Sequence, residues 1–251
     1  MILHAYGDSW TEGEGCDIKE ENKLKNQNLI IYRNQNSWVK LLADKLNLNW
    51  INNGKSGNPN AIIFNQIIDD VTNGRVKKGD FVIILWSSSL RDYAAFLPRQ
   101  QWVSWSVKHL INLPEKFTNS YKSNNPTYDS FLSEYKSFFL NKMFNQNYYN
   151  IVNQNYIIFL QKLFEHYDIR YIMADAFDKM IVDLNSKDNI THLINKFTYW
   201  QFANKTMREH LEQTKMDCFE NTDNPGKHPN KLGYKLISEE FYNYIVKNGI
   251  L

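Results

Sequence analysis

Two residues near opposite ends of the chain have side chains suited to nucleophilic catalysis. Ser9 lies in the stretch Gly7-Asp8-Ser9-Trp10-Thr11-Glu12-Gly13, directly after an apolar run, and His228 lies in a loop that contains Pro and Gly. A serine hydroxyl attacks a carbonyl when a histidine removes its proton, and a carboxylate can orient that histidine. Asp223 is close enough in the sequence to do so if the loop folds back. These residues predict a serine hydrolase site.

The segments that would position these residues alternate between two patterns. Short apolar runs predict buried strands at residues 1–6, 48–52, 81–86 and 170–174. Apolar residues at helical spacing predict helices at residues 37–46, 61–71, 148–167 and 230–246. This alternation predicts an α/β fold with a doubly wound parallel sheet. Ser9 would then lie just beyond the carboxyl end of a central strand, where such sheets bind ligands.

One segment does not fit the alternation. Residues 94–147 are too long for a single crossover and are rich in aromatic side chains. We expect an inserted helical subdomain within one domain that spans residues 1–251. Because the segment follows the third strand, it would lie over the ligand-binding crevice and shape a substrate cleft. Additional core or a dimer surface is an equally favoured interpretation.

Small polar residues follow the second and third predicted strands. The first group includes Gly57 and Asn58, and its glycines let the backbone present N–H groups to a ligand. The second group runs from Trp86 through Ser88 to Arg91. Both groups would lie at the same edge of the sheet as Ser9, where N–H and hydroxyl groups could stabilise an oxyanion.

The motifs, and their order along the chain, resemble those of the SGNH hydrolases, also called the GDSL esterase and lipase family. The stretch around Ser9 is similar to the block that carries the nucleophile, and His228-Pro229-Asn230 followed by Gly233 is similar to the block that carries the base. The resemblance implies a three-layer, flavodoxin-like fold. It also implies that the N–H groups of Ser9 and Gly57 bind the oxyanion, and that no metal or organic cofactor takes part.

Two positions depart from the family pattern. The family's third block supplies an Asn side chain as an oxyanion donor, and Ser88 stands at that position here. The family's acid lies three residues before the histidine, where this chain has Pro225, so either Asp223 completes a looser triad or a Ser-His dyad operates. Asp175, at the end of the fourth predicted strand, is a less favoured substitute.

Three residues near the predicted strand ends are candidates for substrate binding. They are Asn58, Trp86 and Arg91. Arg91 could also compensate for the missing Asn by placing positive charge near the oxyanion, or it could bind an anionic group of the substrate.

Composition excludes several classes of protein. A net charge of +2 over 251 residues gives no sign of a nucleic-acid partner. The two cysteines, Cys16 and Cys218, form no disulfide framework or zinc motif. The sequence shows neither a secretory signal nor an apolar run long enough to cross a bilayer, so we expect a cytoplasmic protein.

The favoured function is hydrolysis of a carboxylic ester through an acyl-serine intermediate. Trp102, Trp105 and Tyr128 in the insertion would suit stacking on sugars, which favours O-acetyl groups on a carbohydrate as the substrate. The alternatives are an O-acyltransferase with the same nucleophile and a noncatalytic carbohydrate-binding module. A nucleotide binder is disfavoured because neither phosphate-binding motif, GxGxxG or GxxxxGK, is present in the first loop.

Overall fold

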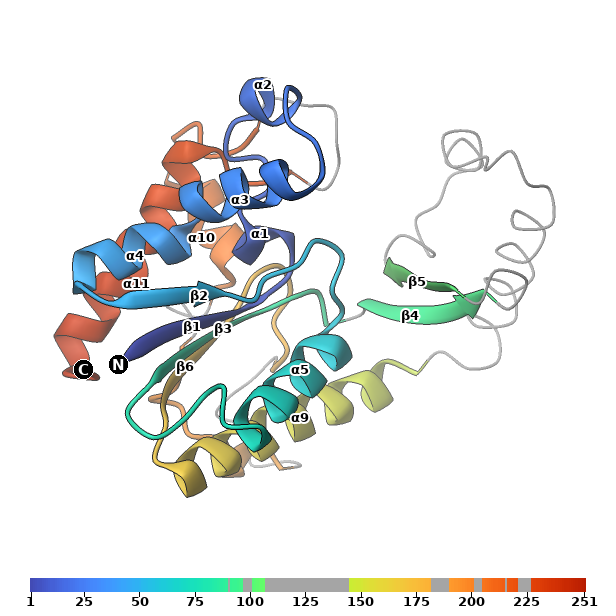
Figure 1. Cartoon of the computed structure of the whole chain (residues 1–251). Coiled ribbons are helices and arrows are strands. Elements are labelled where there is room, and N and C mark those ends of the chain that lie inside the picture. The colour runs from blue at the N-terminus through green and yellow to red at the C-terminus, as the bar shows by residue number, and fades with distance from the viewer. Residues whose placement is uncertain are drawn as a thin grey trace.

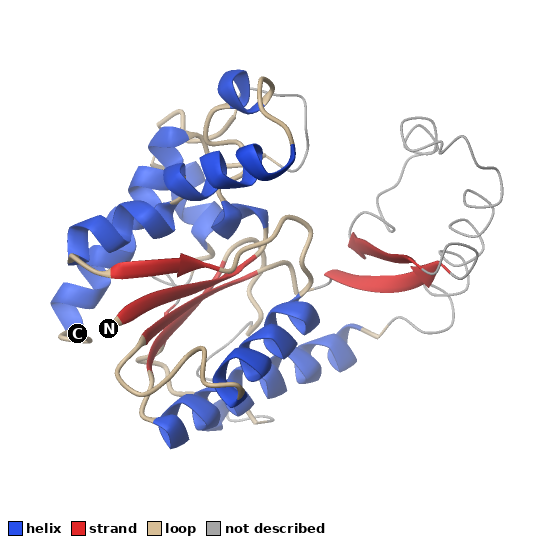
Figure 2. Cartoon of the chain, in the orientation of Figure 1, coloured by secondary structure: helices blue, strands red, loops and turns tan. Residues whose placement is uncertain are grey.

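A five-stranded parallel sheet forms the centre of the protein (Figures 1 and 2). The computed structural model describes residues 1–89, 91–96, 101–106, 145–181, 190–200, 205–214, 216–220 and 227–251. The strands lie in the order β2-β1-β3-β6-β7. Their bounds are β1 Ile2–Gly7, β2 Asn49–Asn52, β3 Phe81–Trp86, β6 Arg170–Asp175 and β7 Tyr199–Trp200. Numbered along the chain, this order is 2-1-3-4-5, the flavodoxin-like doubly wound arrangement. The predicted fold class is confirmed.

The central strand β3 is buried on both faces. Phe81, Ile83 and Leu85 contribute to one hydrophobic core, and Val82 and Ile84 contribute to another on the opposite face. Alternate side chains of a strand point to opposite faces, so a strand covered by helices on both sides needs apolar residues at every position. This requirement explains the unbroken apolar run in the sequence.

Helices cover both faces of the sheet (Figure 1). α4 (Trp38–Leu46) and α11 (Lys231–Asn248) pack on one face, and α5 (Asn60–Thr72) and α9 (Gln146–Tyr167) pack on the other. These are the four helices that the apolar spacing predicts. The amide of Asn230 caps α11 by accepting from the Gly233 N–H at 3.1 Å, which places the preceding residues at the carboxyl edge of the sheet.

Several short elements have no counterpart in the prediction. The helices α1 (Ser9–Glu12), α2 (Ile18–Glu21), α3 (Asn26–Asn36) and α10 (Met207–Gln213), the 3₁₀ turn η3 (Thr191–Leu193) and strand β7 belong to this group. Most are too short to display a periodic pattern. α3 is longer, but none of its residues is buried, so it has no apolar face that could be detected.

The beginning of the predicted insertion is β-structure, which corrects the helical expectation there. β4 (Arg91–Phe96) and β5 (Gln101–Ser106) form an antiparallel pair in which Arg91 lies opposite Ser106. Tyr, Phe, Trp and Val favour strands, and the two runs contain several of them. Figure 2 shows the pair beyond the carboxyl ends of the main strands. Residues 107–144 lie outside the described residues, so the inserted subdomain remains a prediction.

None of the helices in the described part of the chain is both long and apolar enough to cross a membrane.

Candidate active site

Ser9 and His228 lie side by side at the carboxyl edge of the sheet. The Nε2 atom of His228 is 3.1 Å from the Oγ atom of Ser9, although 219 positions separate the two residues in the sequence. Ser9 is the first residue of α1, directly after β1, and His228 lies just before α11. The fold therefore brings together the two ends of the chain that the sequence motifs single out.

Glu220 lies on the other side of the His228 ring. Its Oε1 atom is 3.2 Å from Nδ1 of His228 and accepts the His228 backbone N–H at 3.3 Å. A short antiparallel bridge between Phe219 and Pro229 fixes this arrangement, supported by the bond from the Glu220 N–H to the His228 carbonyl. The side chain of Glu220 is only 6% exposed, so little water competes for its carboxylate.

Asp223, the acid expected from the sequence, lies in the segment 221–226 outside the described residues. Its orienting role stays a prediction. Sequence reasoning missed Glu220 because it is eight positions before His228, and only the pairing of Phe219 with Pro229 brings it opposite the ring. A strand pairing of single residues leaves no periodic signal in the sequence.

The three groups form a chain of contacts suited to proton transfer. A carboxylate can only accept a hydrogen bond, so Glu220 favours the tautomer of His228 that carries its proton on Nδ1. Nε2 then holds a lone pair toward the Ser9 hydroxyl. This is the arrangement in which a histidine acts as a general base toward a serine.

The turn that carries Ser9 is tied to the end of β3 through Asp8. The carboxylate of Asp8 is completely buried and accepts from the Trp10 N–H at 3.1 Å, the Ser87 hydroxyl at 2.7 Å and the Arg91 guanidinium at 2.8 Å. Arg91 was a candidate for binding an anionic part of the substrate. In the structure its guanidinium neutralises Asp8 and braces the turn that carries the nucleophile.

Ser88, predicted as an oxyanion donor, uses its hydroxyl elsewhere. Its Oγ donates to Oδ2 of Asp178 at 2.6 Å, and a hydroxyl has only one proton to donate. The carbonyls of Ser87 and Ser88 face the amide of Asn60 at 3.4 Å. In the structure this proton is used by Asp178, and the donor role of Ser88 stays a prediction.

The Gly57 loop is attached to the helix that begins with Ser9. Glu12, in α1, is buried and accepts the backbone N–H of Ser56. The amide of Asn52 donates to the Thr11 carbonyl at 2.7 Å. Gly57 has φ +83°, and a Cβ added there would have no atom within 4 Å. Open space therefore adjoins the backbone of Gly57, which is what close approach of a ligand requires.

Two further residues predicted to bind substrate are buried. Trp86 is 0% exposed and belongs to the core under α5 and α9, which contradicts its expected contact with substrate. Asn58 is 8% exposed, and its role in substrate binding stays a prediction.

Asp175, the less favoured alternative acid, is buried, and its carboxylate forms hydrogen bonds within the core. It accepts the Tyr199 hydroxyl at 2.6 Å and the Met180 N–H at 3.3 Å, and it is 1% exposed. Burial raises the pKa of this carboxyl to about 7, against the opposing effect of the Tyr199 hydrogen bond.

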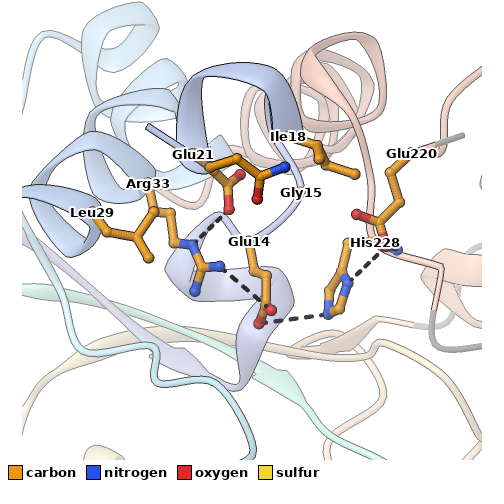
Figure 3. A pocket seen from close by; sticks show the side chains of 9 residues that line it. Glu14, Gly15, Ile18, Glu21, Leu29, Arg33, Glu220 and His228 are labelled. Atoms are coloured by element: carbon orange, nitrogen blue, oxygen red, sulfur yellow. Dashed lines mark hydrogen bonds and ion pairs between the residues drawn. The ribbon is translucent and has the colours of Figure 1, made fainter. Parts of the chain in front are cut away.

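A pocket of about 230 Å³ opens beside His228 (Figure 3). Glu14, Glu21, Arg33, Glu220 and other residues line it. Gly15 also lines it, with φ +85°, and a Cβ there would lie 2.5 Å from the Cβ of His228. The pocket gives a small molecule access to the ring of His228.

Among the described residues, no group of three or more His, Cys, Asp or Glu side chains is arranged to hold a metal ion. The expected absence of a cofactor stays a prediction.

The sequence matches no protein-family model and no curated protein. The solved structures that resemble this chain include three that are similar over nearly its whole length. The first is a protein assigned to the lipolytic G-D-S-L family from Desulfitobacterium hafniense DCB-2, with 12% identity, a TM-score of 0.44, and coverage of 100% of this chain and 99% of that chain. The second is a member of the lipolytic G-D-S-L family from Veillonella parvula DSM 2008, with 12% identity, a TM-score of 0.46, and coverage of 98% of this chain and 97% of that chain. The third is LAE5, an alpha/beta hydrolase from the metagenome of Lake Arreo, Spain, with 14% identity, a TM-score of 0.46, and coverage of 100% of this chain and 95% of that chain.

Proposed function

We propose that the protein is a serine hydrolase that cleaves carboxylic esters. The observation that carries the proposal is the chain of contacts from Ser9 through His228 to Glu220, with distances of 3.1 and 3.2 Å. The resemblance of the flanking motifs to SGNH hydrolases agrees with this chemistry. In the proposal, Glu220 takes the orienting role that the sequence assigned to Asp223.

The reaction proceeds in two halves. Nε2 of His228 takes the Ser9 proton while Oγ attacks the ester carbonyl, and the resulting imidazolium gives that proton to the departing alcohol. An acyl group is then bonded to Oγ. Water attacks this acyl-serine, His228 takes a proton from the water, and the proton returns to Ser9 when the carboxylic acid leaves. Glu220 stabilises the imidazolium during both halves.

The oxyanion of each tetrahedral intermediate needs hydrogen-bond donors. We assign this role to the backbone N–H groups of Ser9 and Gly57. The attachment of the Gly57 loop to α1 through Glu12 supports the assignment, because it fixes both groups relative to each other. Loss of one such donor typically costs about 10² to 10³ in rate.

For the substrate we propose a small-molecule or carbohydrate ester, with O-acetyl groups on a sugar as the favoured case. This finer proposal rests on Trp102, Trp105 and Tyr128 in the insertion, whose side chains lie outside the described ones.

The test is hydrolysis of acetylated sugars and short-chain acyl esters by the wild type and by Ser9→Ala. We expect turnover by the wild type, a loss of at least about 10⁴-fold in Ser9→Ala, and covalent labelling of Ser9 by a fluorophosphonate probe. Ser238→Ala is the matched control, since it removes a hydroxyl that is buried in α11 and has no hydrogen-bond partner among the described residues. Equal turnover by the wild type and Ser9→Ala would refute the serine mechanism.

Two other outcomes would redirect the proposal. Absence of labelling in well-folded protein would favour a noncatalytic carbohydrate-binding module on the same fold. Transfer of acetyl to an added sugar at a rate above hydrolysis would favour an O-acyltransferase with the same nucleophile.

A further inference from the structure

The carboxylate of Glu14 lies next to the atoms that would react. Its Oε2 atom is 3.7 Å from Nε2 of His228, the same nitrogen that faces Ser9. Figure 3 shows the Glu14 side chain between Arg33 and His228, on the opposite side of the ring from Glu220. The proton transfers assigned above use Glu220 and leave Glu14 without a role.

Contacts on both oxygens hold Glu14 in place. Oε2 accepts the Ser56 hydroxyl at 2.5 Å, and Oε1 is 3.4 Å from Nη2 of Arg33. Its side chain is 25% exposed, on the wall of the pocket beside His228. A ligand in this pocket can therefore reach a carboxylate of fixed position.

The charge near Glu14 remains negative after pairing. Three carboxylates, Glu12, Glu14 and Glu21, share the single guanidinium of Arg33. The lysines next to this region in the sequence are all exposed, so water and salt screen their charges; they are Lys19, Lys23, Lys25, Lys55 and Lys227. A substrate would meet a net negative potential at this side of the site.

The proposed mechanism determines which part of a substrate meets Glu14. Nε2 of His228 must come within about 3 Å of the leaving oxygen to protonate it. The leaving oxygen then lies no more than about 7 Å from Oε2 of Glu14, given the distance of 3.7 Å between Oε2 and Nε2. A charge one or two carbons away from the ester oxygen would interact with Glu14 through a partly desolvated space.

We propose that Glu14 is a specificity-determining residue that selects esters whose leaving alcohol carries a positively charged ammonium group near the ester oxygen. An amino alcohol or an amino sugar has this chemistry. A leaving group with a carboxylate at the same position would be rejected by repulsion. This inference rests on the proposed esterase function.

The test compares three acetate esters whose leaving alcohols differ in charge. Acetylcholine carries a cationic leaving group, propyl acetate a neutral one, and acetoxyacetate an anionic one. We expect wild-type kcat/KM to fall in that order, with acetylcholine preferred to acetoxyacetate by about 10- to 100-fold. Glu14→Gln should lower this ratio by about 10-fold or more, because the amide keeps the shape but not the charge.

The matched control is Glu165→Gln, which removes an exposed carboxylate paired with Lys162 on α9. It should keep the wild-type ratio. Because each ratio is measured within one variant, partial loss of folded enzyme cancels.

A second readout does not depend on turnover of acetates. Phosphonothiolates with a choline-like or a propyl leaving group should inactivate the wild type at different rates, and Glu14→Gln should lose the difference. An unchanged preference in Glu14→Gln, or none in the wild type, would overturn the role of Glu14 while Ser9-dependent hydrolysis of propyl acetate upholds the esterase. Failure of every ester and every probe to react at Ser9 would refute the esterase itself and this inference with it.

Discussion

Two of the histidine–carboxylate pairs in the described part of the chain lie at opposite edges of the sheet. His228 and Glu220 are at the carboxyl edge, whereas His4, in β1, has its Nε2 atom 3.7 Å from Oδ2 of Asp80 just before β3. Both side chains of the second pair are almost completely buried, at 2% and 4% exposure. The side chain of His228 is 13% exposed beside a pocket.

The difference shows what turns such a pair into a candidate catalytic site. The carboxylate of Asp80 accepts the Ile2 N–H at 2.9 Å and the Lys77 N–H at 3.2 Å, so it connects the chain segments at the amino edge of the sheet. Of these two described histidines, His228 is the one with a serine hydroxyl at its second nitrogen and with a pocket beside its ring. We therefore expect the first pair to support reaction and the second to support the fold.

Exchange of each histidine for glutamine tests this comparison most strongly. His228→Gln should lower kcat by about 10⁴-fold or more, because Ser9 loses its base. His4→Gln should leave kcat within about twofold and act on stability instead. Ester hydrolysis and urea denaturation of both variants provide the measurements. A comparable loss of kcat in the two would show that the comparison is wrong.

Substitution of Glu220 and of Asp223 tests which carboxylate orients His228. Glu220→Gln should lower kcat by about 10² to 10⁴-fold, since an amide does not stabilise the imidazolium. Asp223→Asn is the matched control and should retain most activity. A larger loss of kcat in Asp223→Asn than in Glu220→Gln would mean that Asp223 orients His228, as the sequence predicts, and that Glu220 only holds the loop.

Removal of Arg91 tests the support behind Ser9. Arg91→Ala leaves the buried carboxylate of Asp8 without its cation, and such losses cost about 3–5 kcal/mol in free energy of unfolding. Arg208→Ala, which breaks an exposed pair with Glu212, should cost less than about 1 kcal/mol. Urea unfolding of both variants measures this. Equal costs would mean that Asp8 does not depend on Arg91.

The smallest expected effect is the pH dependence from His4. Burial lowers the pKa of His4 below its ordinary value of 6.5, although Asp80 opposes the shift. The unfolded chain therefore takes up a proton below about pH 6.5 that the folded protein resists, so stability is lost as the pH falls from there toward the lower, folded pKa.

Between pH 7.5 and 5.5 the resulting loss in free energy of unfolding is at most about 1.4 kcal/mol, because pH 5.5 lies one unit below the ordinary pKa of 6.5 and one unit is worth about 1.4 kcal/mol. We expect the wild type to lose more stability than His4→Gln across this interval. The difference between the two pH profiles removes the contribution of Asp175, because both proteins share it. The raised pKa of Asp175 increases stability as the pH falls, opposite to the effect of His4. Identical pH profiles would show that His4 titrates normally in the folded state.

The sequence predicted the parts of the fold that leave a periodic or apolar signal. The four longer strands of the parallel sheet and the four helices that pack on it give such a signal, and the motifs around Ser9 and His228 give a local one. Strand β7 has two residues and α3 has no buried face, so neither produces a pattern. The β4–β5 pair was mistaken for helix because abundant aromatic residues indicate burial more clearly than they indicate element type.

Local sequence motifs predict some residues of the candidate site. Other residues reach the site only through contacts between distant parts of the chain, and the sequence does not predict these. Ser9 and His228 follow from their neighbours in the sequence. Glu220 depends on a pairing of single residues, and Ser88 depends on the position of Asp178, a residue from a distant loop. Trp86 illustrates a third difficulty, because the last residue of a strand can point into the core or toward the crevice.

The close approach of Gly15 to His228 has a consequence for protein design. Even a methyl group at position 15 would overlap the histidine's own Cβ, and the backbone there has a conformation that side chains disfavour. A designer who grafts only the serine, histidine and glutamate onto another scaffold would therefore omit a necessary part. The graft must also carry a residue with no side chain at all, chosen for the volume that it leaves empty.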